Sequence, residues 1–334
     1  MRFNPIQKIY VMATTGALGD TIATFPTLRL LADRGHIEKI FVDNRYFELY
    51  RLFFKDDILV SLDRARRVIP ANEVTPDIPR HVIDPRTGEA RFLDYPLNPN
   101  LPVVQTMRPA PTSIHCHLVD CFSIALCDAI LKESEKDYPG IGQVAYPRPV
   151  EGKYAVIAYG ATTEHRRMLP EAFDSVVEKL IEYSITPVVI GNRNHKLQCN
   201  GVTTSPHFDG VSFEKCINLI DKTTIVEALG IISGADVVVG LDNGLIHLAG
   251  LTDVPIVVGY TTVDPYYRMP YRHGEKGWHT YSVVPDSLCK YCQTETYCTY
   301  GIDFLRCNST TFECMNSLSP QKWLDQLDRA LERS

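Results

Sequence analysis

The chain has 334 residues, of which 45% are hydrophobic and 22% are charged. These fractions are ordinary for globular proteins, so they exclude a wholly disordered, collagen-like or coiled-coil chain and suggest two domains or one large one. The formal net charge of −6 argues against a general binder of nucleic acid or anionic membrane, although a local basic groove is still compatible with it.

The chain contains no apolar run that approaches the roughly 18 residues needed to span a bilayer. Its first 20 residues lack the basic start, long apolar centre and small-residue cleavage site of a signal peptide. We therefore expect a soluble, cytoplasmic protein without a transmembrane segment. In a reducing compartment the ten cysteines are not expected to form a disulfide framework.

The first half of the chain alternates short apolar runs with helical periodicity. In chain order the pattern predicts a strand over 8–15, a helix over 21–34, a strand over 40–43, a helix over 46–54, a strand over 58–62 and a long helix over 113–135. Nine prolines fall between residues 70 and 111, which excludes long regular elements there and favours loops and short strands near a cleft.

The second half repeats the alternation after a Pro- and Gly-rich linker at 138–152. The predicted elements are strands at 154–159, 186–190, 235–241 and 255–260 and helices at 170–183, 224–233, 243–251 and 321–333. Such alternation predicts parallel sheets covered by helices. We expect two Rossmann-like α/β domains, over 1–145 and 152–318, followed by a final helix over 319–334.

The first motif with chemical potential lies between the first strand and the first helix. Gly16 to Gly19 allow a tight turn, and Asp20 follows at the edge where open α/β sheets bind ligands. The alternative is that Asp20 only caps the helix, which is common for this residue type. The spacing is not that of the dinucleotide-binding glycine motif, so a nicotinamide or flavin site is disfavoured.

The second motif follows the predicted strand at 235–241. Asp242, Asn243, Gly244 and Leu245 form a turn into a helix, where free amides and the helix dipole can bind a phosphate. His247 lies one turn into that helix. The alternatives are a capping role for Asp242 and a packing role for His247.

The third motif follows the predicted strand at 154–159. Thr162, Thr163 and Arg167 lie where a second strand edge is expected, and hydroxyl and guanidinium groups both suit phosphate oxygens. A solvated polar loop is the alternative.

The fourth motif is a cysteine-rich segment at 289–314. The spacing of its cysteines is that of metal ligands, because thiolates in a tight turn can share one tetrahedral ion, zinc or iron. Four of the five are expected to bind a structural metal, and free thiols are the alternative. The candidates are Cys289, Cys292, Cys298, Cys307 and Cys314.

Together these motifs resemble the heptosyltransferases of glycosyltransferase family 9, including the autotransporter heptosyltransferases. The resemblance covers most of the chain in order and is most specific in the second half. It departs from the family pattern at Asn243, where Thr is usual, and at Arg167, where Lys is common. The matching stretches are Gly19-Asp20, Ala161-Thr162-Thr163, Glu227 before Ala235-Asp236, Asp242 to Ala249, and Gly259 to Pro265.

The resemblance implies a GT-B fold, in which two Rossmann-like domains face each other across a cleft, with the last helix packed back on the N-terminal domain. It implies that the N-terminal domain is the acceptor domain and the C-terminal domain is the nucleotide-sugar domain. It also implies an inverting transfer of a heptose-like sugar from a nucleoside-diphosphate donor to an acceptor hydroxyl of a saccharide, with Asp20 as general base. The leaving diphosphate would be stabilised by Thr162, Thr163, Arg167 and the amides of Asn243, Gly244 and Leu245.

The resemblance also implies that Glu227 holds the ribose hydroxyls and that Asp242 and His247 shape the phosphate loop or touch the sugar. No catalytic metal is expected, because no D-x-D motif is evident. In the autotransporter relatives cysteines hold an iron, which adds to the expectation of a structural zinc or iron.

Three alternatives remain open at this point. The first keeps the reaction but moves the sugar to protein or to modified bases of DNA, since Arg64, Arg66, Arg67, Arg80, Arg86 and Arg91 cluster in the N-terminal half. The second is a nicotinamide-dependent oxidoreductase or a nucleotide-sugar epimerase. The third is a nucleotide-sugar-binding module without activity.

Overall fold

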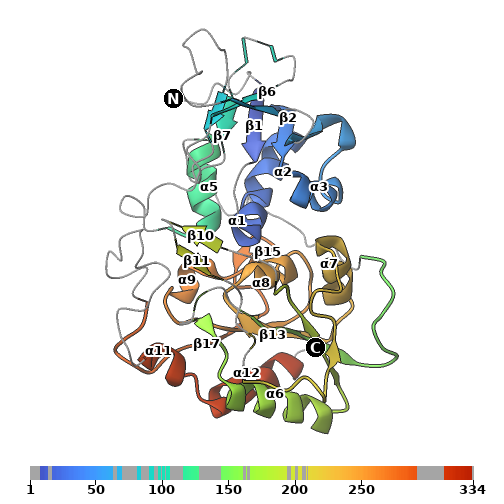
Figure 1. Ribbon diagram of the computed structural model, residues 1–334, viewed down its shortest axis with the longest axis vertical. Helices are drawn as coiled ribbons and strands as arrows, with labels where there is room; N and C mark the ends of the chain where they lie inside the picture. The colour runs from blue at the N-terminus through green and yellow to red at the C-terminus, as the bar shows by residue number, and fades with distance from the viewer. Residues whose placement is uncertain are drawn as a thin grey trace. The chain divides into compact units, whose positions relative to one another are not determined.

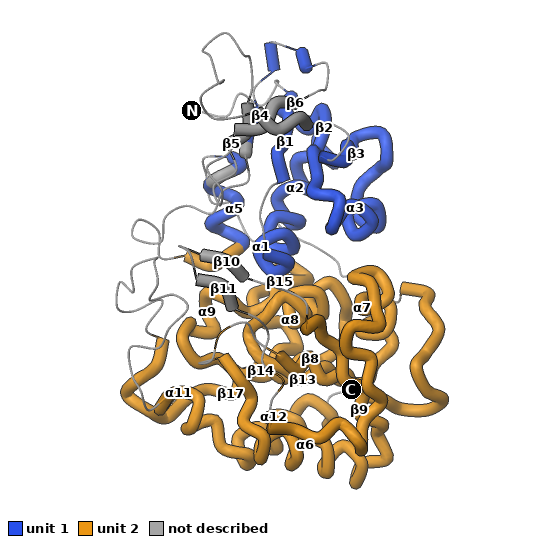
Figure 2. The backbone as a smooth tube through the Cα atoms, in the orientation of Figure 1, with its two compact units in different colours: residues 1–110, 119–136 blue, residues 111–118, 137–334 orange. Residues whose placement is uncertain are grey.

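The chain forms two compact units, coloured separately in Figure 2. Unit 1 comprises residues 1–110 and 119–136, and unit 2 comprises residues 111–118 and 137–334. The computed structural model describes residues 8–13, 17–62, 66–69, 81–83, 90–93, 97–98, 100–101, 103–105, 116–127, 144–160, 163, 166–193, 197–199, 202–204, 208, 210–291 and 312–332. Within this described part, no helix is long and apolar enough to cross a bilayer.

Unit 1 is built on a parallel four-stranded sheet in the order β3-β2-β1-β7 (Figure 1). Its strands are β1 (Ile9–Ala13), β2 (Ile37–Val42), β3 (Leu59–Ser61) and β7 (Val103–Gln105). Its helices are α1 (Leu18–Ala23), α2 (Phe25–Asp33), α3 (Asn44–Arg51), the short 3-10 helix η1 (Asp56–Ile58) and α5 (Leu118–Cys127). The predicted helix over 21–34 is therefore two helices, and Pro26 lies in the first turn of the second, where proline is well tolerated.

Aromatic packing and one buried hydroxyl pair hold the helices of unit 1. The ring of Phe25 on α2 packs on the ring of Tyr50 on α3, with centroids 4.8 Å apart. The ring of Phe53 also packs on Phe25, at 5.0 Å between centroids. Thr27 of α2 and Ser123 of α5 share a buried hydrogen bond of 2.7 Å between their hydroxyl oxygens. These contacts fix the helices that follow β1 against the sheet.

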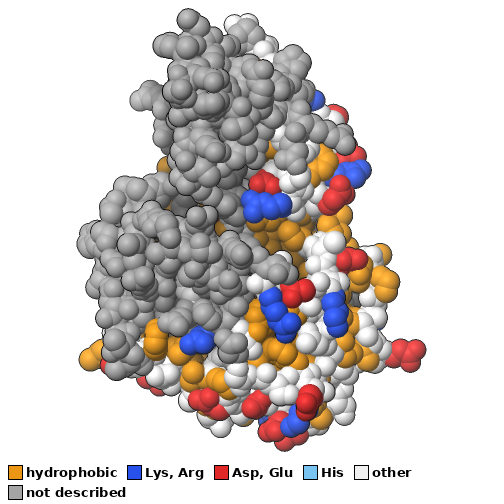
Figure 3. Space-filling view, in the orientation of Figure 1, with side chains coloured by type: hydrophobic (Ala, Val, Ile, Leu, Met, Phe, Trp, Pro, Cys, Tyr) orange, Lys and Arg blue, Asp and Glu red, His pale blue; other side chains and the backbone are white. Residues whose placement is uncertain are grey.

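The strands described within the proline-rich stretch, residues 70–111, are short: β5 (His81–Ile83), β6 (Ala90–Leu93) and β7. β5 and β6 form a small antiparallel sheet with β4 (Arg66–Ile69), which precedes the stretch, and β6 is the central strand. The prediction of short strands there is confirmed. Three of the six arginines of the predicted basic surface, at 64, 80 and 86, lie outside the described residues, and on the face in Figure 3 basic and acidic side chains are interspersed over the described surface.

Unit 2 is built on a parallel six-stranded sheet in the order β12-β9-β8-β13-β14-β17. Its strands are β8 (Tyr154–Ala158), β9 (Thr186–Ile190), β12 (Ile217–Asn218), β13 (Val237–Leu241), β14 (Ile256–Gly259) and β17 (Thr280–Val283). Two hairpins add β10 (Leu197–Cys199) with β11 (Val202–Thr204), and β15 (Tyr271–Arg272) with β16 (Glu275–Lys276).

The helices of unit 2 cover both faces of this sheet, as Figure 1 shows. They are α6 (Pro170–Glu182), α7 (Ile225–Ser233), α8 (Gly244–Ala249), α9 (Pro265–Arg268), α11 (Glu313–Asn316) and α12 (Pro320–Leu331). Ile157 and Val237 face the core formed with α6 and α12, whereas the hydroxyl of Tyr154 on the opposite face donates to the carbonyl of Ile231 in α7. This alternation follows from the two-residue period of a strand.

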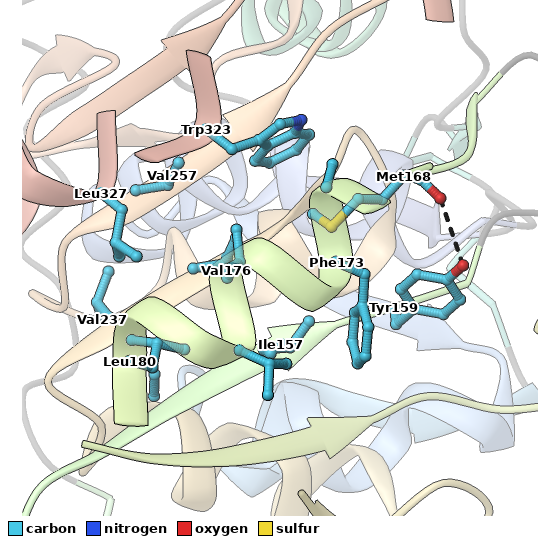
Figure 4. Close-up of a cluster of buried hydrophobic side chains, with 14 of the residues drawn as sticks. Ile157, Tyr159, Met168, Phe173, Val176, Leu180, Val237, Val257, Trp323 and Leu327 are labelled. Atoms are coloured by element: carbon cyan, nitrogen blue, oxygen red, sulfur yellow. Dashed lines mark hydrogen bonds between the residues drawn. The ribbon is translucent and has the colours of Figure 1, made fainter. Parts of the chain in front are cut away.

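The last helix, α12, packs on α6 and the sheet of unit 2. Trp323, Leu327 and Ala330 are fully buried on one helical face, and they join the core of α6 and the sheet shown in Figure 4. The Trp323 ring lies so close to Gly259 that a Cβ there would stand 2.7 Å from it. Because burying one large apolar side chain contributes about 1.5–3 kcal/mol, this face decides where the helix docks.

A fully buried arginine closes the region between α8 and β17. The guanidinium of Arg272 donates to the carbonyls of Thr252, Trp278 (3.0 Å) and His279 (3.2 Å), and it lies 4.9 Å from the centroid of the Trp278 indole. Burial lowers the pKa of Arg272 to about 10, so the side chain stays protonated at neutral pH. One cation thus satisfies three backbone carbonyls at once.

We expect Arg272→Met to destabilise unit 2 by about 3 kcal/mol or more, because each buried acceptor left without a donor costs about 1–3 kcal/mol. Urea unfolding followed by circular dichroism and Trp fluorescence measures the loss. Lys215→Ala is the control, since this lysine and its partner Glu178 are 62% and 60% exposed and such pairs contribute under about 1 kcal/mol. Equal midpoints for the two variants would contradict the structural role of Arg272.

Candidate active site

Three neighbouring strands of unit 2 end at one edge of the sheet, and the loops after them carry the polar residues of the site. β13 pairs with β8 on one side and with β14 on the other. The loop after β8 carries Thr163 and Arg166, the loop after β13 carries Asp242 and Asn243, and the loop after β14 carries Thr262. Carboxyl ends of parallel strands are where open α/β sheets bind ligands.

Asp242 is the charged centre of this edge. Its side chain is only 9% exposed, its Oδ2 lies 3.5 Å from Nη1 of Arg166, and its Oδ1 lies 3.6 Å from Nε2 of His247. Burial by itself raises the pKa of Asp242, but Arg166, His247 and Arg268 together lower it well below its usual range. The carboxylate is therefore ionised, and it lies beside Arg166 from the loop after β8 and His247 of α8, with Arg268 of α9 adding a second positive charge.

Two buried hydroxyls accompany this carboxylate. The hydroxyl oxygens of Thr163 and Tyr260 make no hydrogen bond within the described residues, although the two side chains are 3% and 0% exposed. Burial, together with the negative charge of Asp242, raises the pKa of Tyr260, which keeps its hydroxyl protonated. Buried polar atoms without partners are costly, so these groups indicate a place where a water or a ligand supplies the missing partner.

Asn243 caps α8 and ties it to the end of β8. Its Oδ1 accepts the amides of Leu245 (2.9 Å) and Ile246 (3.2 Å), and its Nδ2 donates to the carbonyls of Ala158 and Gly160 at 3.3 Å. The amide of Leu245, which the sequence analysis assigned to phosphate binding, is thus already used. In the part of the chain described here, the amides of Asn243 and Gly244 have no acceptor.

The loop after β8 presents a different arginine from the one that the sequence analysis selected. Arg166 contacts Asp242, and its Nε donates to Oγ1 of Thr262 at 3.4 Å. Arg167 is partly buried just before α6, and Thr162 lies outside the described residues. The sequence shows only that two arginines are adjacent here. Helices and strands have a regular period that predicts which side chains share a face, but a loop has none, so the sequence does not tell which of the two arginines faces the site.

Glu227 has a local role that does not favour the predicted contact with ribose. Its carboxylate accepts the amide of Thr224 at 2.7 Å while the hydroxyl of Thr224 accepts the amide of Glu227 at 3.2 Å, which is a complete capping box. These bonds, with a further one from Tyr146, lower the pKa of Glu227. The start of α7 therefore accounts for this glutamate.

Asp20 belongs to unit 1 and lies in the first turn of α1. It is the third residue of the helix, and the N-cap is Ala17, which has no side-chain hydrogen bond. Asp20 is therefore not the N-cap that the alternative interpretation required. Gly19 beside it is buried, and Asp20 itself is half-buried. An acidic residue in the first helical turn is favoured by the helix dipole.

The cysteine-rich segment is described only at its two ends, by Cys289 and Cys314; the other three candidates, at 292, 298 and 307, lie outside the described residues. Ser287 ties these ends together, since its hydroxyl contacts the carboxylate of Glu313 (3.4 Å) and accepts the amide of Cys289 (2.9 Å). No group of three or more His, Cys, Asp or Glu side chains gathers within the described ranges.

Comparison with known proteins identifies the family of this site. The sequence model of glycosyltransferase family 9 (heptosyltransferase) matches residues 123–286, which include the loops after β8, β13 and β14. A curated relative, lipooligosaccharide heptosyltransferase 2 of Haemophilus influenzae, is 37% identical over 57 residues. That match spans 17% of this chain and only 16% of the relative.

Solved structures resemble the fold over nearly the whole chain. The iron-containing dodecameric glycosyltransferase TibC of enterotoxigenic E. coli has a TM-score of 0.65 at 15% identity, covering 98% of this chain and 77% of its own. A family 9 glycosyl transferase of Veillonella parvula has a TM-score of 0.59 at 13% identity, covering 100% of this chain and 99% of its own. At such identities the likeness shows the fold, which confirms the predicted α/β, GT-B class. Residues 123–286, which carry the site, are thus similar in sequence to glycosyltransferase family 9.

Proposed function

We propose that this protein is an inverting glycosyltransferase that moves a sugar from a nucleoside-diphosphate donor to an acceptor hydroxyl. The observation that carries the proposal is the buried cluster of Asp242, Arg166 and His247 at the carboxyl edge of the sheet, inside the region that matches family 9. Two arginines, Arg166 and Arg268, act on this one carboxylate. Guanidinium groups bind the phosphate oxygens of a diphosphate well.

The proposed reaction has one bond made and one broken at the anomeric carbon. The acceptor oxygen attacks this carbon, its proton passes to the Asp20 carboxylate, and the electron pair of the broken C–O bond leaves with the diphosphate. Attack from the side opposite the leaving group inverts the anomeric configuration. The cationic cluster in unit 2 stabilises the charge that develops on the diphosphate, which is where preorganised donors lower a barrier most.

A heptose donor is the finer part of this proposal. TibC has been solved in complex with ADP-D-β-D-heptose, and the curated relative is a lipooligosaccharide heptosyltransferase. We therefore propose an ADP-activated heptose-like donor and a saccharide acceptor. The family match favours this function over the nicotinamide-dependent oxidoreductase and over a module without activity.

Donor binding is tested by thermal unfolding with ADP-heptose, UDP-glucose, GDP-mannose and NAD. A ligand that binds only the folded protein stabilises it, by about 2.7 kcal/mol at a concentration 100 times its dissociation constant, so the melting temperature should rise with a nucleotide sugar and stay unchanged with NAD. Stabilisation by NAD and by none of the nucleotide sugars would contradict the proposal.

Asp20→Ala should reduce turnover by about 10²–10⁴-fold, the usual contribution of a general base. Nucleotide-sugar affinity should stay the same, because Asp20 belongs to unit 1 and the proposed donor site to unit 2. Single-turnover kinetics and calorimetry separate the two effects. Asp33→Ala is the matched control, since this carboxylate in α2 is 61% exposed and pairs only with Arg29 among the contacts described. Equal losses of donor affinity and turnover would contradict the base assignment.

We further propose that the cysteine-rich segment holds a structural zinc or iron. The support is that the first and last cysteines lie at ends joined by the Ser287 and Glu313 contact, and that Tyr291 donates its amide to the carbonyl of Thr261 at 2.9 Å. The segment thus returns to its starting point beside the loop after β14. Thiolates suit either metal, and the neighbour TibC is an iron-containing protein.

Elemental analysis of the purified protein should find about one metal ion per protein chain if four cysteines bind a single zinc. Cys289→Ser and Cys314→Ser should each lower the metal content and the melting temperature, because metal binding contributes folding free energy. Cys216→Ser is the control, since burial raises the pKa of Cys216 to about 11 and disfavours the thiolate that a metal requires. Metal content near zero in the unmodified protein would exclude the centre.

A further inference from the structure

The chain passes from unit 2 to unit 1 at the start of α5. Residues 111–118 belong to unit 2 and residues 119–136 to unit 1, so α5 begins at Leu118 in one unit and continues in the other (Figure 2). His117 and Leu118 are only 1% and 3% exposed. The point at which the chain changes units is therefore buried, and the contacts on either side of it determine how α5 is held.

A buried histidine fixes the side of this point that belongs to unit 2. Nε2 of His117 lies 2.9 Å from the carbonyl oxygen of Met269, the residue that follows α9. A carbonyl oxygen only accepts, so Nε2 carries the hydrogen of this bond. The imidazole ring also lies 6.2 Å, between centroids, from the ring of Tyr271 in β15. The residue before α5 is thus bonded to the segment between α9 and β15.

The segment that accepts this bond is held firmly by other contacts within unit 2. The amide of Met269 donates to the carbonyl of Pro265 at 2.8 Å, and Pro270 lies so close to Gly250 that a Cβ there would stand 2.6 Å from it. Arg272, three residues after Met269, donates to three backbone carbonyls. We therefore expect this segment to keep its place when the bond from His117 is removed.

A pair of hydroxyls fixes α5 within unit 1. Ser123 lies about one and a half turns into the helix, and its buried hydroxyl is 2.7 Å from that of Thr27 in α2. The Ser123 hydroxyl donates its one hydrogen to the carbonyl of Val119 at 3.1 Å, so Thr27 is the donor within the pair. Only Thr24 separates α2 from α1, the helix that contains Asp20.

We propose that His117 is a positioning residue for the sugar transfer, because it anchors to unit 2 the start of a helix that unit 1 bonds to the helix pair α1 and α2. This inference rests on the proposed function, in which Asp20 of unit 1 acts on a donor bound to unit 2. Six positions separate His117 from Ser123, so one short stretch of α5 carries both anchors. A misplacement of about 1 Å far from the reacting atoms can slow a reaction by about 10²-fold.

The test compares His117→Leu with Tyr154→Phe, since each change removes one side-chain donor to a buried backbone carbonyl of unit 2. The hydroxyl of Tyr154 donates to the carbonyl of Ile231 at 2.7 Å, and this bond joins β8 to α7. Both variants should lower the urea midpoint of unfolding by similar amounts, because each leaves one carbonyl without its donor. Stability alone therefore does not distinguish them.

Only His117→Leu should slow the transfer, by about 10- to 100-fold. The rate is measured in single turnovers as the release of ADP from ADP-heptose, with and without lipooligosaccharide that lacks heptose as the acceptor probe. The affinity for ADP, measured by calorimetry, should change by less than about 3-fold in both variants, because the segment after α9 stays in place. His117→Gln should restore most of the rate, since its carboxamide nitrogen can donate to the carbonyl of Met269.

Ser123→Ala tests the anchor at the other end. It should also slow ADP release without changing the affinity for ADP. In the His117→Leu background it should add little, because the stretch of α5 is already released at one end. Independent, multiplicative losses of rate would overturn the shared role of the two anchors. If His117→Leu does not fold, Ser123→Ala carries the comparison with Tyr154→Phe.

The outcomes separate this inference from the proposed function. If the unmodified protein neither binds ADP nor releases it from ADP-heptose, the proposed function fails and this inference fails with it. If the unmodified protein does both and His117→Leu is as fast as Tyr154→Phe, this inference alone fails. Equal losses of ADP affinity and rate in His117→Leu would show that the histidine shapes the donor site, which also overturns the positioning role.

Discussion

The second unit depends on a buried carboxylate that the fold can tolerate only with cations around it. An unpaired charge inside a protein is costly, whereas unit charges about 4 Å apart at an effective dielectric constant of about 20 attract by about 4 kcal/mol. Asp242 meets this constraint with the positive charges of Arg166 and Arg268, and its other oxygen lies 3.6 Å from Nε2 of His247. This constraint brings together the loops after β8, β13 and β14, because Arg166, Asp242 and Thr262, one from each loop, contact one another.

At the same edge of the sheet, the side chain of Asn243 forms hydrogen bonds that tie the start of α8 to the end of β8. Its amide oxygen occupies the amides of Leu245 and Ile246, and its amide nitrogen holds the carbonyls of Ala158 and Gly160. The cap thus uses part of the helix N-terminus that a phosphate would otherwise reach. The same side chain also connects α8 to the start of the loop that carries Arg166, through the carbonyls of Ala158 and Gly160.

Much of the second unit could be predicted from the sequence because its signals are local. The strand at 186–190 matches β9 residue for residue, and the start of α8 follows from the preference of Asn for the N-cap. The contact of Arg166 with Asp242 could not be predicted, because a loop has no period that tells which of two adjacent arginines faces a given side chain. The surface of unit 2 on which α12 packs could not be predicted either, because the spacing of Trp323, Leu327 and Ala330 defines an apolar face but not the surface that covers it.

Two acidic residues lie in the first turns of helices, and their capping differs. Glu227 and Asp20 are both the third residue of a helix. At α7 the N-cap is Thr224, whose hydroxyl forms the reciprocal half of a capping box, so the helix itself requires the glutamate. At α1 the N-cap is Ala17, which has no side-chain acceptor, so no reciprocal box can form around Asp20. Helix capping therefore explains the carboxylate in α7, whereas in α1 the helix dipole favours Asp20 without a capping box.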